Sequence, residues 1–265
     1  LNDRKILRLC TIPIKWTPPV EIFRKINLST FFFLDSAGVS ASNENSRWTY
    51  LSISEPHSVI RSDRQKTDPI ETLGRILNSY EVIHGNGEDI PFRGGAVGYV
   101  SYECLKHFDT IHLRKKPGLN IPESYFIIPN DYLAFDLSLK KAWLVTLSEK
   151  KTALKNLAHT LNLPARTGGF RFGRAQANFS EETFSKAVNK VKGYIREGDI
   201  FQANIAQRWH GDFSGNAGAL YLKLRKINPS PYSCYFSFPE LEIVSCSPEL
   251  LIRRRGNVVE TRPIA

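Results

Sequence analysis

The chain has 265 residues, of which 42% are hydrophobic and 23% charged, and this composition indicates a soluble globular protein with one or two domains. Its apolar runs, such as residues 31–34, are far shorter than the roughly 20 residues that cross a bilayer, which argues against a transmembrane helix. The formal net charge of +10 would suit nucleic acid, small anions or an acidic protein, but the basic residues are scattered along the chain. We therefore expect neither a nucleic-acid partner nor a membrane.

The start of the chain and its cysteines indicate the cellular compartment, and the two ends of the chain indicate whether the sequence is a fragment. No signal-peptide pattern occurs at the start, and the four cysteines lack both metal-ligand spacing and disulfide density, so a reducing cytoplasm is expected. The chain begins with Leu1, contains no Met and stops at Ala265 directly after a predicted strand. We interpret it as a fragment.

The first part of the chain is predicted to be rich in strands. Residues 31–36 and 47–53 read as two antiparallel strands joined by a long loop. Apolar side chains at helical spacing predict a helix over 68–84, and residues 93–99 then resume as a glycine-rich strand. These glycines fit close backbone packing better than phosphate binding, because their spacing does not match a dinucleotide motif.

A second strand pair is predicted within residues 131–147, followed by a helix over 149–161. The loop over 164–176 is rich in Gly and Arg and is the candidate domain boundary. We accordingly predict one domain over 1–165 and a second that starts at residue 166 and runs to 265.

The helix that begins at Ser180 has the clearest signals in the chain. Ser180 is a suitable N-cap, Phe179 and Phe184 are spaced for a hydrophobic staple, and Gly198 ends the pattern. Its expected buried stripe consists of Phe184, Ala187, Val188, Val191, Tyr194 and Ile195.

Residues 198–208 follow at once and predict a strand with two unlike faces. At a period of two residues, Gln202, Asn204 and Arg208 point to one side, and apolar side chains such as Phe201 point to the other. Such residues on an edge strand are more often solvated than functional, but a face of amides and one guanidinium fits a polar ligand.

The remaining residues predict a helix near 218–227 and strands over 233–238, 242–246, 250–255 and 257–261. Sequential strands with short turns, together with segregated helices, imply an α+β fold with antiparallel sheets. Ser247-Pro248-Glu249 joins two of these strands and places Glu249 at the mouth of the sheet, although this tripeptide is also common in ordinary turns. The sequence contains no catalytic-triad arrangement and no zinc-binding motif that competes with these residues.

Four ordered segments resemble the chorismate-utilising enzymes. They are residues 198–208, Asn228 to Tyr232, Ser247 to Glu249, and Glu260 to Ala265. Upstream, residues 12–16, 34–36, 47–50 and 93–99 resemble the N-terminal region of the synthase components that work with a glutamine amidotransferase. The resemblance covers nearly the whole chain, and it implies antiparallel sheets packed as a sandwich with flanking helices, of which the C-terminal half is incomplete here.

Gln202 is the discriminating position within this family. Isochorismate and salicylate synthases carry a Lys there, which as a base can activate water, whereas Gln is never basic. The resemblance therefore implies ammonia as the nucleophile, and it assigns Gln202 to the catalytic residues. Asn204 and the Leu-Asp-Ser of residues 34–36 resemble the aminodeoxychorismate branch more than the anthranilate branch.

The resemblance also implies roles for several other residues. Glu249 is expected to act as the general acid on the departing 4-hydroxyl of chorismate, a role that needs a carboxyl kept protonated by burial or by nearby negative charge. A Mg²⁺ ion is the expected cofactor, with its ligands beyond Ala265 and therefore outside this chain. The expected substrate pocket consists of Asn204, Arg208, Thr261 and Ala265.

Ala265 departs from one pattern of the family. Some aminodeoxychorismate synthases have at this position a Lys that is thought to attack the ring covalently. Ala implies either direct attack by ammonia or the anthranilate branch.

A tryptophan-type pocket is the second expected site, and the alternative is that its prolines only stiffen a connection. Its expected residues are Asp35, Ser36, Asn228, Pro231, Ser233 and Cys234. The preferred hypothesis is aminodeoxychorismate synthase component I, with ammonia supplied by a glutaminase partner for para-aminobenzoate and folate synthesis. The alternatives are anthranilate synthase component I, in tryptophan synthesis, and a non-catalytic binding module of the same fold.

Overall fold

The computed structural model describes residues 4–37, 46–62, 68–85, 90–110 and 119–264. The chain divides into two compact units, and each is described by itself. The larger unit combines residues 1–167 with 220–265, and the smaller consists of residues 168–219. The domain boundary expected between residues 165 and 166 stays a prediction.

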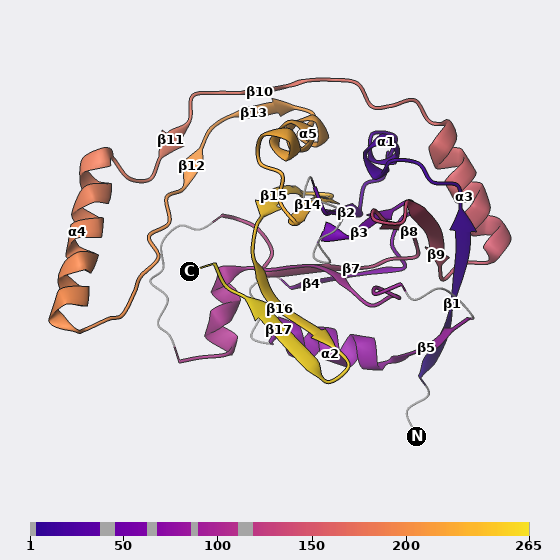
Figure 1. The fold of residues 1–265 in the computed structure, drawn as a ribbon, viewed down its shortest axis with the longest axis horizontal. Helices are drawn as coiled ribbons and strands as arrows, with labels where there is room; N and C mark the ends of the chain where they lie inside the picture. The colour runs from indigo at the N-terminus through magenta and orange to yellow at the C-terminus, as the bar shows by residue number, and fades with distance from the viewer. Residues whose placement is uncertain (1–3, 38–45, 63–67, 86–89, 111–118, 265) are drawn as a thin grey trace. The chain divides into compact units, whose positions relative to one another are not determined.

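An eight-stranded sheet is the largest element of the larger unit (Figure 1). From one edge to the other its strands are Leu241–Ser247 (β15), Tyr232–Phe238 (β14), Phe31–Asp35 (β2), Trp48–Ser52 (β3), Asp131–Asp136 (β8), Lys141–Thr146 (β9), Lys5–Ile14 (β1) and Tyr80–His84 (β5). Neighbouring strands are antiparallel except β1 and β5, which pair in parallel.

The same unit contains a three-stranded sheet and a separate hairpin. The three strands are antiparallel, in the order Ser58–Ser62 (β4), Ser124–Ile128 (β7) and Val97–Val100 (β6). The hairpin consists of Leu250–Arg255 (β16) and Val258–Arg262 (β17). The remaining elements are Pro19–Phe23 (α1), Pro69–Asn78 (α2), the 3-10 helix Tyr102–His107 (η2), Lys150–Asn162 (α3) and Ala217–Ile227 (α5), whose residues from Leu220 onward belong to this unit.

The two sheets pack face to face, as expected for an α+β sandwich with flanking helices. Phe32 and Tyr50 of the large sheet share one hydrophobic cluster with Tyr125 and Ile127 of β7. The alternate residues of β7, such as Phe126, pack against apolar side chains of α2 instead. Figure 1 shows these layers, with α1 and α5 beside the outer face of the large sheet and α2 beneath the small one.

Aromatic rings fill the outer face of the large sheet. Phe33 stacks on Phe23 of α1 with ring centroids 4.9 Å apart, and its ring lies 5.8 Å from that of Tyr221 on α5. All three side chains are at most 5% exposed. Helices α1 and α5 therefore close this face as the small sheet closes the other.

Close backbone packing explains one glycine of the segment over 93–99. A Cβ atom on Gly98 would lie 1.9 Å from the carbonyl oxygen of Tyr125 on the neighbouring strand. Only glycine permits β6 and β7 to approach this closely, which confirms the structural interpretation of this position.

The helix expected over residues 68–84 is shorter in the structure. Helix α2 ends at Asn78, and Tyr80–His84 form strand β5. The apolar residues of this strand, Val82 and Ile83, are β-branched and favour extended backbone. The strands expected over 31–36, 47–53 and 131–147 are confirmed by the pairing of β2 with β3 and of β8 with β9.

The smaller unit contains one helix, Glu181–Glu197 (α4), and two short strand pairs. Phe170–Phe172 (β10) pairs with Phe213–Gly215 (β13), and Gln176–Ala177 (β11) pairs with Trp209–His210 (β12). The predicted ends of α4 are confirmed. The Ser180 hydroxyl accepts a hydrogen bond from the Thr183 amide at 3.2 Å, and Gly198 has a left-handed φ of 80°.

Two expectations for this unit are wrong. Residues 199–208 form no strand, and no residue of α4 is buried, so the predicted apolar stripe of the helix packs against no core. A strand needs a neighbour to pair its backbone groups, and residues 199–207 have none. The segment is anchored near its end by Gln207, whose Nε2 donates to the Phe179 carbonyl at 3.4 Å, and by Arg208. The Arg208 amide donates to Asn178 Oδ1 at 2.7 Å, and the Arg208 carbonyl accepts from the Asn178 amide at 2.9 Å.

Candidate functional site

The polar residues of the segment 198–208 are solvent-exposed in the smaller unit. Gln202, Asn204 and Arg208 are all exposed, and Phe201 is 94% exposed. Side chains in this state present hydrogen-bonding groups but do not form an enclosed pocket. Their expected catalytic and substrate-binding roles stay predictions.

Glu249 and Thr261 belong to the larger unit, at the open end of the β16–β17 hairpin. Glu249 directly precedes Leu250, which pairs with Arg262, so Glu249 and Thr261 lie at the same end of the hairpin. Both residues are exposed. The burial that a general acid needs is therefore not supplied to Glu249 by the described residues. Ala265 lies outside the described residues.

An ion cluster holds this hairpin. Glu260 accepts hydrogen bonds from Arg253 at 2.5 and 3.1 Å and a further one from Arg262. The Arg253 and Arg262 guanidinium groups lower the pKa of Glu260 below its usual value. The carboxylate therefore stays charged and fixes Arg253 on the face of the hairpin that carries Glu260.

The residues of the expected tryptophan-type pocket lie close together. Asp35 pairs with Ser233 across β2 and β14, and the Ser36 hydroxyl donates to the Trp48 carbonyl at 2.8 Å and to the Pro231 carbonyl at 3.4 Å. Asn228 follows α5 directly, and its amide donates to the Leu224 carbonyl at 2.8 Å. The structure thus brings together segments that are almost 200 residues apart in the sequence.

The same residues divide between the two faces of the sheet. Asp35 and Ser233 are register partners and share the face that α5 covers. Cys234 comes one residue later, so its side chain lies on the opposite face and packs against the sandwich core. Whether any of them binds tryptophan stays a prediction.

Sequence reasoning missed the partners of Asp35. The Asp35 carboxylate is 3% exposed, and it accepts hydrogen bonds from the Tyr221 hydroxyl at 2.8 Å and from Arg225 Nε at 2.5 Å. Burial, followed by the charge of Asp35, raises the pKa of Tyr221 far above its usual value, so Tyr221 stays a donor. Tyr221 and Arg225 are four residues apart on α5, and this spacing on one helix face was the available signal.

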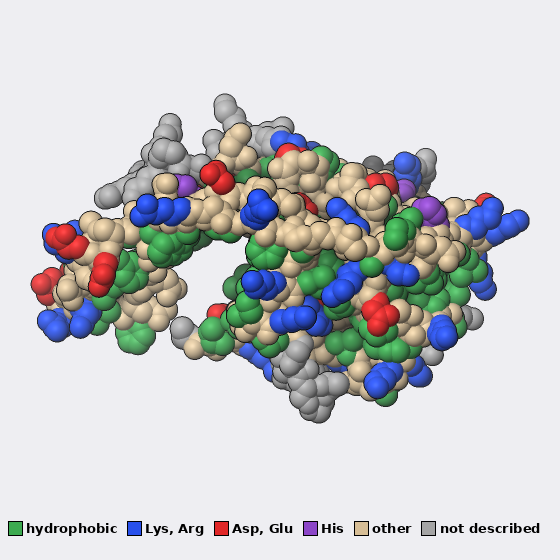
Figure 2. Space-filling view, turned by 90° about the horizontal axis from the view of Figure 1, so that it is seen from above, with side chains coloured by type: hydrophobic (Ala, Val, Ile, Leu, Met, Phe, Trp, Pro, Cys, Tyr) green, Lys and Arg blue, Asp and Glu red, His purple; other side chains and the backbone are tan. Residues whose placement is uncertain are grey.

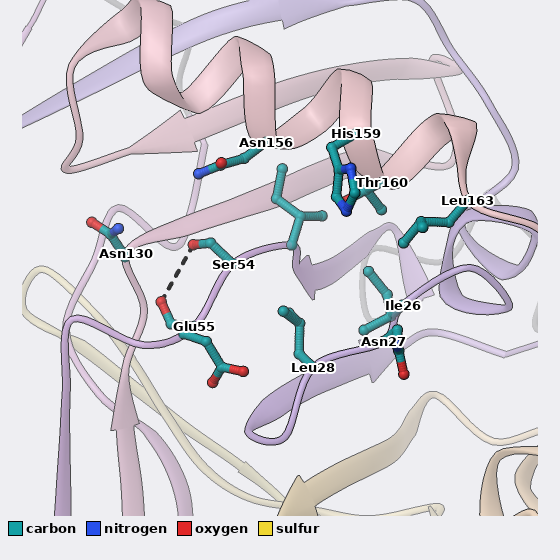
Figure 3. Close-up of a pocket in the computed structure, with 11 residues that line it drawn as sticks. Ile26, Asn27, Leu28, Ser54, Glu55, Asn130, Asn156, His159, Thr160 and Leu163 are labelled. Atoms are coloured by element: carbon teal, nitrogen blue, oxygen red, sulfur yellow. Dashed lines mark hydrogen bonds between the residues drawn. The ribbon is translucent and has the colours of Figure 1, made fainter.

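A cavity of about 360 Å³ lies beside α3 in the larger unit, and the sequence did not indicate it (Figure 3). It is lined by Ile26, Asn27, Leu28, Ile53, Ser54, Glu55, Asn130, Asn156, His159, Thr160 and Leu163. The lining combines apolar side chains with amide, hydroxyl, imidazole and carboxylate groups, which is the usual composition of a small-molecule site.

The sequence profile of the chorismate binding enzyme family matches residues 35–265. The chain belongs to this family. Among individual proteins, it is 35% identical over 210 residues to aminodeoxychorismate synthase component 1 of Bacillus subtilis, a match that covers 75% of this chain and 44% of that protein. It is 27% identical over 285 residues to anthranilate synthase component 1 of Acetivibrio thermocellus, covering 93% and 56% of the two chains.

Solved structures confirm the fold of this family member. The crystal structure of anthranilate synthase component I from Streptococcus pneumoniae matches with a TM-score of 0.69 at 20% identity, over 92% of this chain and 58% of that one. The menaquinone-specific isochorismate synthase MenF of Escherichia coli matches with a TM-score of 0.56 at 14% identity, over 96% and 53% of the two chains. The chain spans about half the length of the relatives it matches.

The described residues do not form a magnesium site. They contain no group of three or more His, Cys, Asp or Glu side chains that could hold a metal ion. The resemblance assigned the expected ligands to positions beyond Ala265, so the dependence on Mg²⁺ stays a prediction. Within the described part of the chain, no helix is long and apolar enough to span a membrane.

Lys and Arg side chains lie at several separate places on the face drawn in Figure 2, with Asp and Glu among them. This distribution gives no single basic surface in that view. The absence of a nucleic-acid partner, like the cytoplasmic location, stays an expectation from the sequence.

Proposed function

We propose that the protein to which this chain belongs is an aminodeoxychorismate synthase component I, which uses ammonia to replace the 4-hydroxyl of chorismate with an amino group. The observation that carries this proposal is Gln202, because an amide side chain cannot serve as the base that water would need as a nucleophile. Ammonia is itself a sufficient nucleophile and requires no such base. The fold is shared with an isochorismate synthase, so the fold alone does not decide between water and ammonia as the nucleophile. The proposal of ammonia therefore depends on Gln202.

Glu249 is the proposed general acid. In the proposed step the nitrogen of ammonia forms a bond to the ring, the bond to the 4-hydroxyl breaks, and Glu249 donates the proton with which that hydroxyl leaves as water. Its position in the connection before β16 leaves the carboxyl accessible to a substrate. The burial required for this role would come from chain outside the described residues.

The proposed ammonia source is a glutamine amidotransferase partner, and the proposed product serves para-aminobenzoate and folate synthesis. The match to the component 1 protein of Bacillus subtilis supports this assignment. Anthranilate synthase component I is the second candidate. It is favoured by the matches to anthranilate synthases, one of which covers 93% of the chain. Ala265 is compatible with both branches and does not separate them.

A product assay tests the proposal. The full-length protein is incubated with chorismate, ammonia and Mg²⁺, and the lyase that converts aminodeoxychorismate to para-aminobenzoate is then added. We expect para-aminobenzoate only after addition of the lyase. Anthranilate formed without the lyase would establish the second candidate, and the absence of any product would favour a non-catalytic module.

Glu249→Gln tests the assigned general acid. The variant keeps the size and the exposed position of the side chain but cannot donate the proton, so we expect turnover to fall by at least about 100-fold with an unchanged melting temperature. Glu240→Gln, another exposed carboxyl of the same unit, is the matched control and should retain activity. Near-normal turnover of Glu249→Gln would show that another group supplies the proton.

A further inference from the structure

We propose that the cavity beside α3 is a binding site for a small organic ammonium ion with an apolar body. The cavity lies wholly within the larger unit and has a volume of about 360 Å³, enough for a ligand with one aromatic ring or a short chain. The site does not depend on the proposed chorismate chemistry, since none of its lining residues is among those assigned to that reaction.

The charge of the lining selects a cation. Glu55 contributes a carboxylate, and no Lys or Arg lines the cavity. Two basic side chains that bond to residues of this region are directed to backbone carbonyls: Lys25 Nζ donates to the Leu161 carbonyl at 2.6 Å, and Arg166 donates to the Ile26 carbonyl at 3.4 Å. An organic anion would meet the Glu55 charge with no Lys or Arg in the lining to offset it, whereas an ammonium group would gain an ion pair with Glu55.

Glu55 is held in place at the cavity. Its carboxylate accepts hydrogen bonds from the Ser29 amide at 3.1 Å and from the Ser29 hydroxyl at 3.2 Å. The Ser54 hydroxyl donates to the Glu55 carbonyl at 3.4 Å, as Figure 3 shows. A fixed carboxylate loses less side-chain freedom when it binds an ammonium group than a free one does.

A buried carboxylate fixes the orientation of Asn156. Asp131 is fully buried and accepts hydrogen bonds from the Thr146 hydroxyl at 2.6 Å and from Asn156 Nδ2 at 2.7 Å. A carboxylate only accepts, so the amide nitrogen must face Asp131, and no described residue donates a hydrogen bond to the side-chain carbonyl oxygen of Asn156 in the lining. This oxygen adds a second acceptor for an ammonium group.

Four further polar side chains of the lining have no hydrogen-bond partner among the described residues: those of Asn27, Asn130, His159 and Thr160. Thr160 is only 4% exposed as a residue, and it contributes to the lining of the cavity. An unpaired polar side chain in the lining of a cavity can form a hydrogen bond with a ligand or with water.

The apolar part of the lining accommodates the body of the ligand. Ile26 and Ile53 are at most 3% exposed, and Leu28 and Leu163 are half-buried beside them. Figure 3 shows Ile26 and Leu163 on the side of the cavity opposite Asn130, with Leu28 between the two sides. A bare metal ion would not use this surface, and the lining supplies only Glu55 and His159 as charged or imidazole ligands.

Isothermal titration calorimetry of the full-length protein with three probes of similar size tests the proposal. The probes are 2-phenylethylammonium, the neutral 2-phenylethanol and the anion phenylacetate. We expect millimolar binding of the ammonium probe, about fivefold weaker binding of the alcohol and no binding of the anion. Equal affinity for the ammonium and the alcohol, or no binding of the ammonium probe, would overturn the proposal.

Glu55→Gln removes the charge but keeps an acceptor for Ser29, so we expect it to abolish the preference for the ammonium probe and the salt dependence of its binding. Glu81→Gln changes an exposed carboxylate outside the cavity and should bind like the wild type. Leu163→Phe narrows the cavity and should weaken all probes together. An unchanged ammonium affinity in Glu55→Gln would place the probe elsewhere and refute the assignment.

Discussion

Strand β8 of the larger unit and helix α4 of the smaller unit both have regular apolar patterns, but they differ in how far their residues are buried. All six residues of β8 are buried, because it lies in the middle of the large sheet with cover on both faces. None of the 17 residues of α4 is buried, although its apolar stripe is as regular as any in the chain. The comparison teaches that an apolar pattern identifies the face that can be buried, while burial itself depends on which partner segments are present.

The largest expected effect is a stability contrast between two phenylalanines. Phe33 is fully buried on the large sheet, so Phe33→Ala should lower the free energy of unfolding by about 3–5 kcal/mol. Phe201 is 94% exposed in the smaller unit, so Phe201→Ala should change it by less than about 0.5 kcal/mol. Urea unfolding followed by tryptophan fluorescence measures both. A cost above 1 kcal/mol for Phe201→Ala would mean that residues 199–208 acquire a packing partner in solution.

Removing an ion pair should also cost more stability in the larger unit than on α4, with a slightly smaller difference in the free energy of unfolding than for the two phenylalanines. Asp35→Ala leaves Arg225 and Tyr221 without their buried acceptor and should lower the free energy of unfolding by about 3 kcal/mol. Glu182→Ala removes an exposed pair with Lys186 on α4 and should cost at most about 0.5 kcal/mol. Thermal unfolding of the two variants under identical conditions gives the comparison. Equal losses would contradict the assignment of Asp35 to a buried network.

The lowered pKa of Asp136 predicts how the stability of the larger unit changes in acid. Burial alone would raise the pKa of this carboxyl, but the Arg47 guanidinium, at 2.6 and 2.9 Å, and the backbone amides of Leu139 and Ser138 lower it below its usual value. A lowered pKa in the folded state stabilises the fold above the unfolded pKa of about 4, and this contribution is lost as the pH falls through the folded value.

Asp136→Asn should therefore reduce the free energy of unfolding by about 1.5 kcal/mol at neutral pH, and the difference from wild type should shrink in acid. Glu197→Gln, an exposed residue of α4, should leave the pH profile unchanged. Unfolding midpoints between pH 2 and 7 test this. A difference that stays constant across that range would show that Arg47 does not stabilise the charged form.

Most strands of the larger unit could be predicted from the sequence because each is marked by neighbouring residues, namely an apolar run bounded by a turn. Residues 131–147 have two apolar runs separated by a turn, and the structure pairs them as β8 and β9. Helix α2 was predicted too long because Tyr80–His84 is compatible with both structures, and its pairing with β1, about 75 residues away, decides for a strand. Periodicity contains no information about such distant partners.

Residues of the candidate sites could be predicted only where they belong to a recognisable sequence motif. Gln202 and Glu249 are recognised from their neighbours in the sequence, yet neither is enclosed by the described residues. The partners of Asp35 and the cavity beside α3 depend instead on segments joined by folding, such as residues 26–28 with Asn156 and His159. No short window of the sequence contains these combinations.

The smallest expected effect concerns the cap of α4 and tests whether this helix is stabilised by its own sequence. Ser180→Ala removes the hydrogen bond to the Thr183 amide and should weaken the helix by about 1 kcal/mol. Because α4 buries no residue, the loss should appear as faster hydrogen exchange of its amides, while the unfolding midpoint of the larger unit stays unchanged. Ser185→Ala, an exposed substitution within the helix, should slow exchange slightly, since Ala has the higher helix propensity. If Ser180→Ala instead lowered the midpoint of the whole protein, α4 would unfold together with the larger unit, and the contrast between the two regions would not hold.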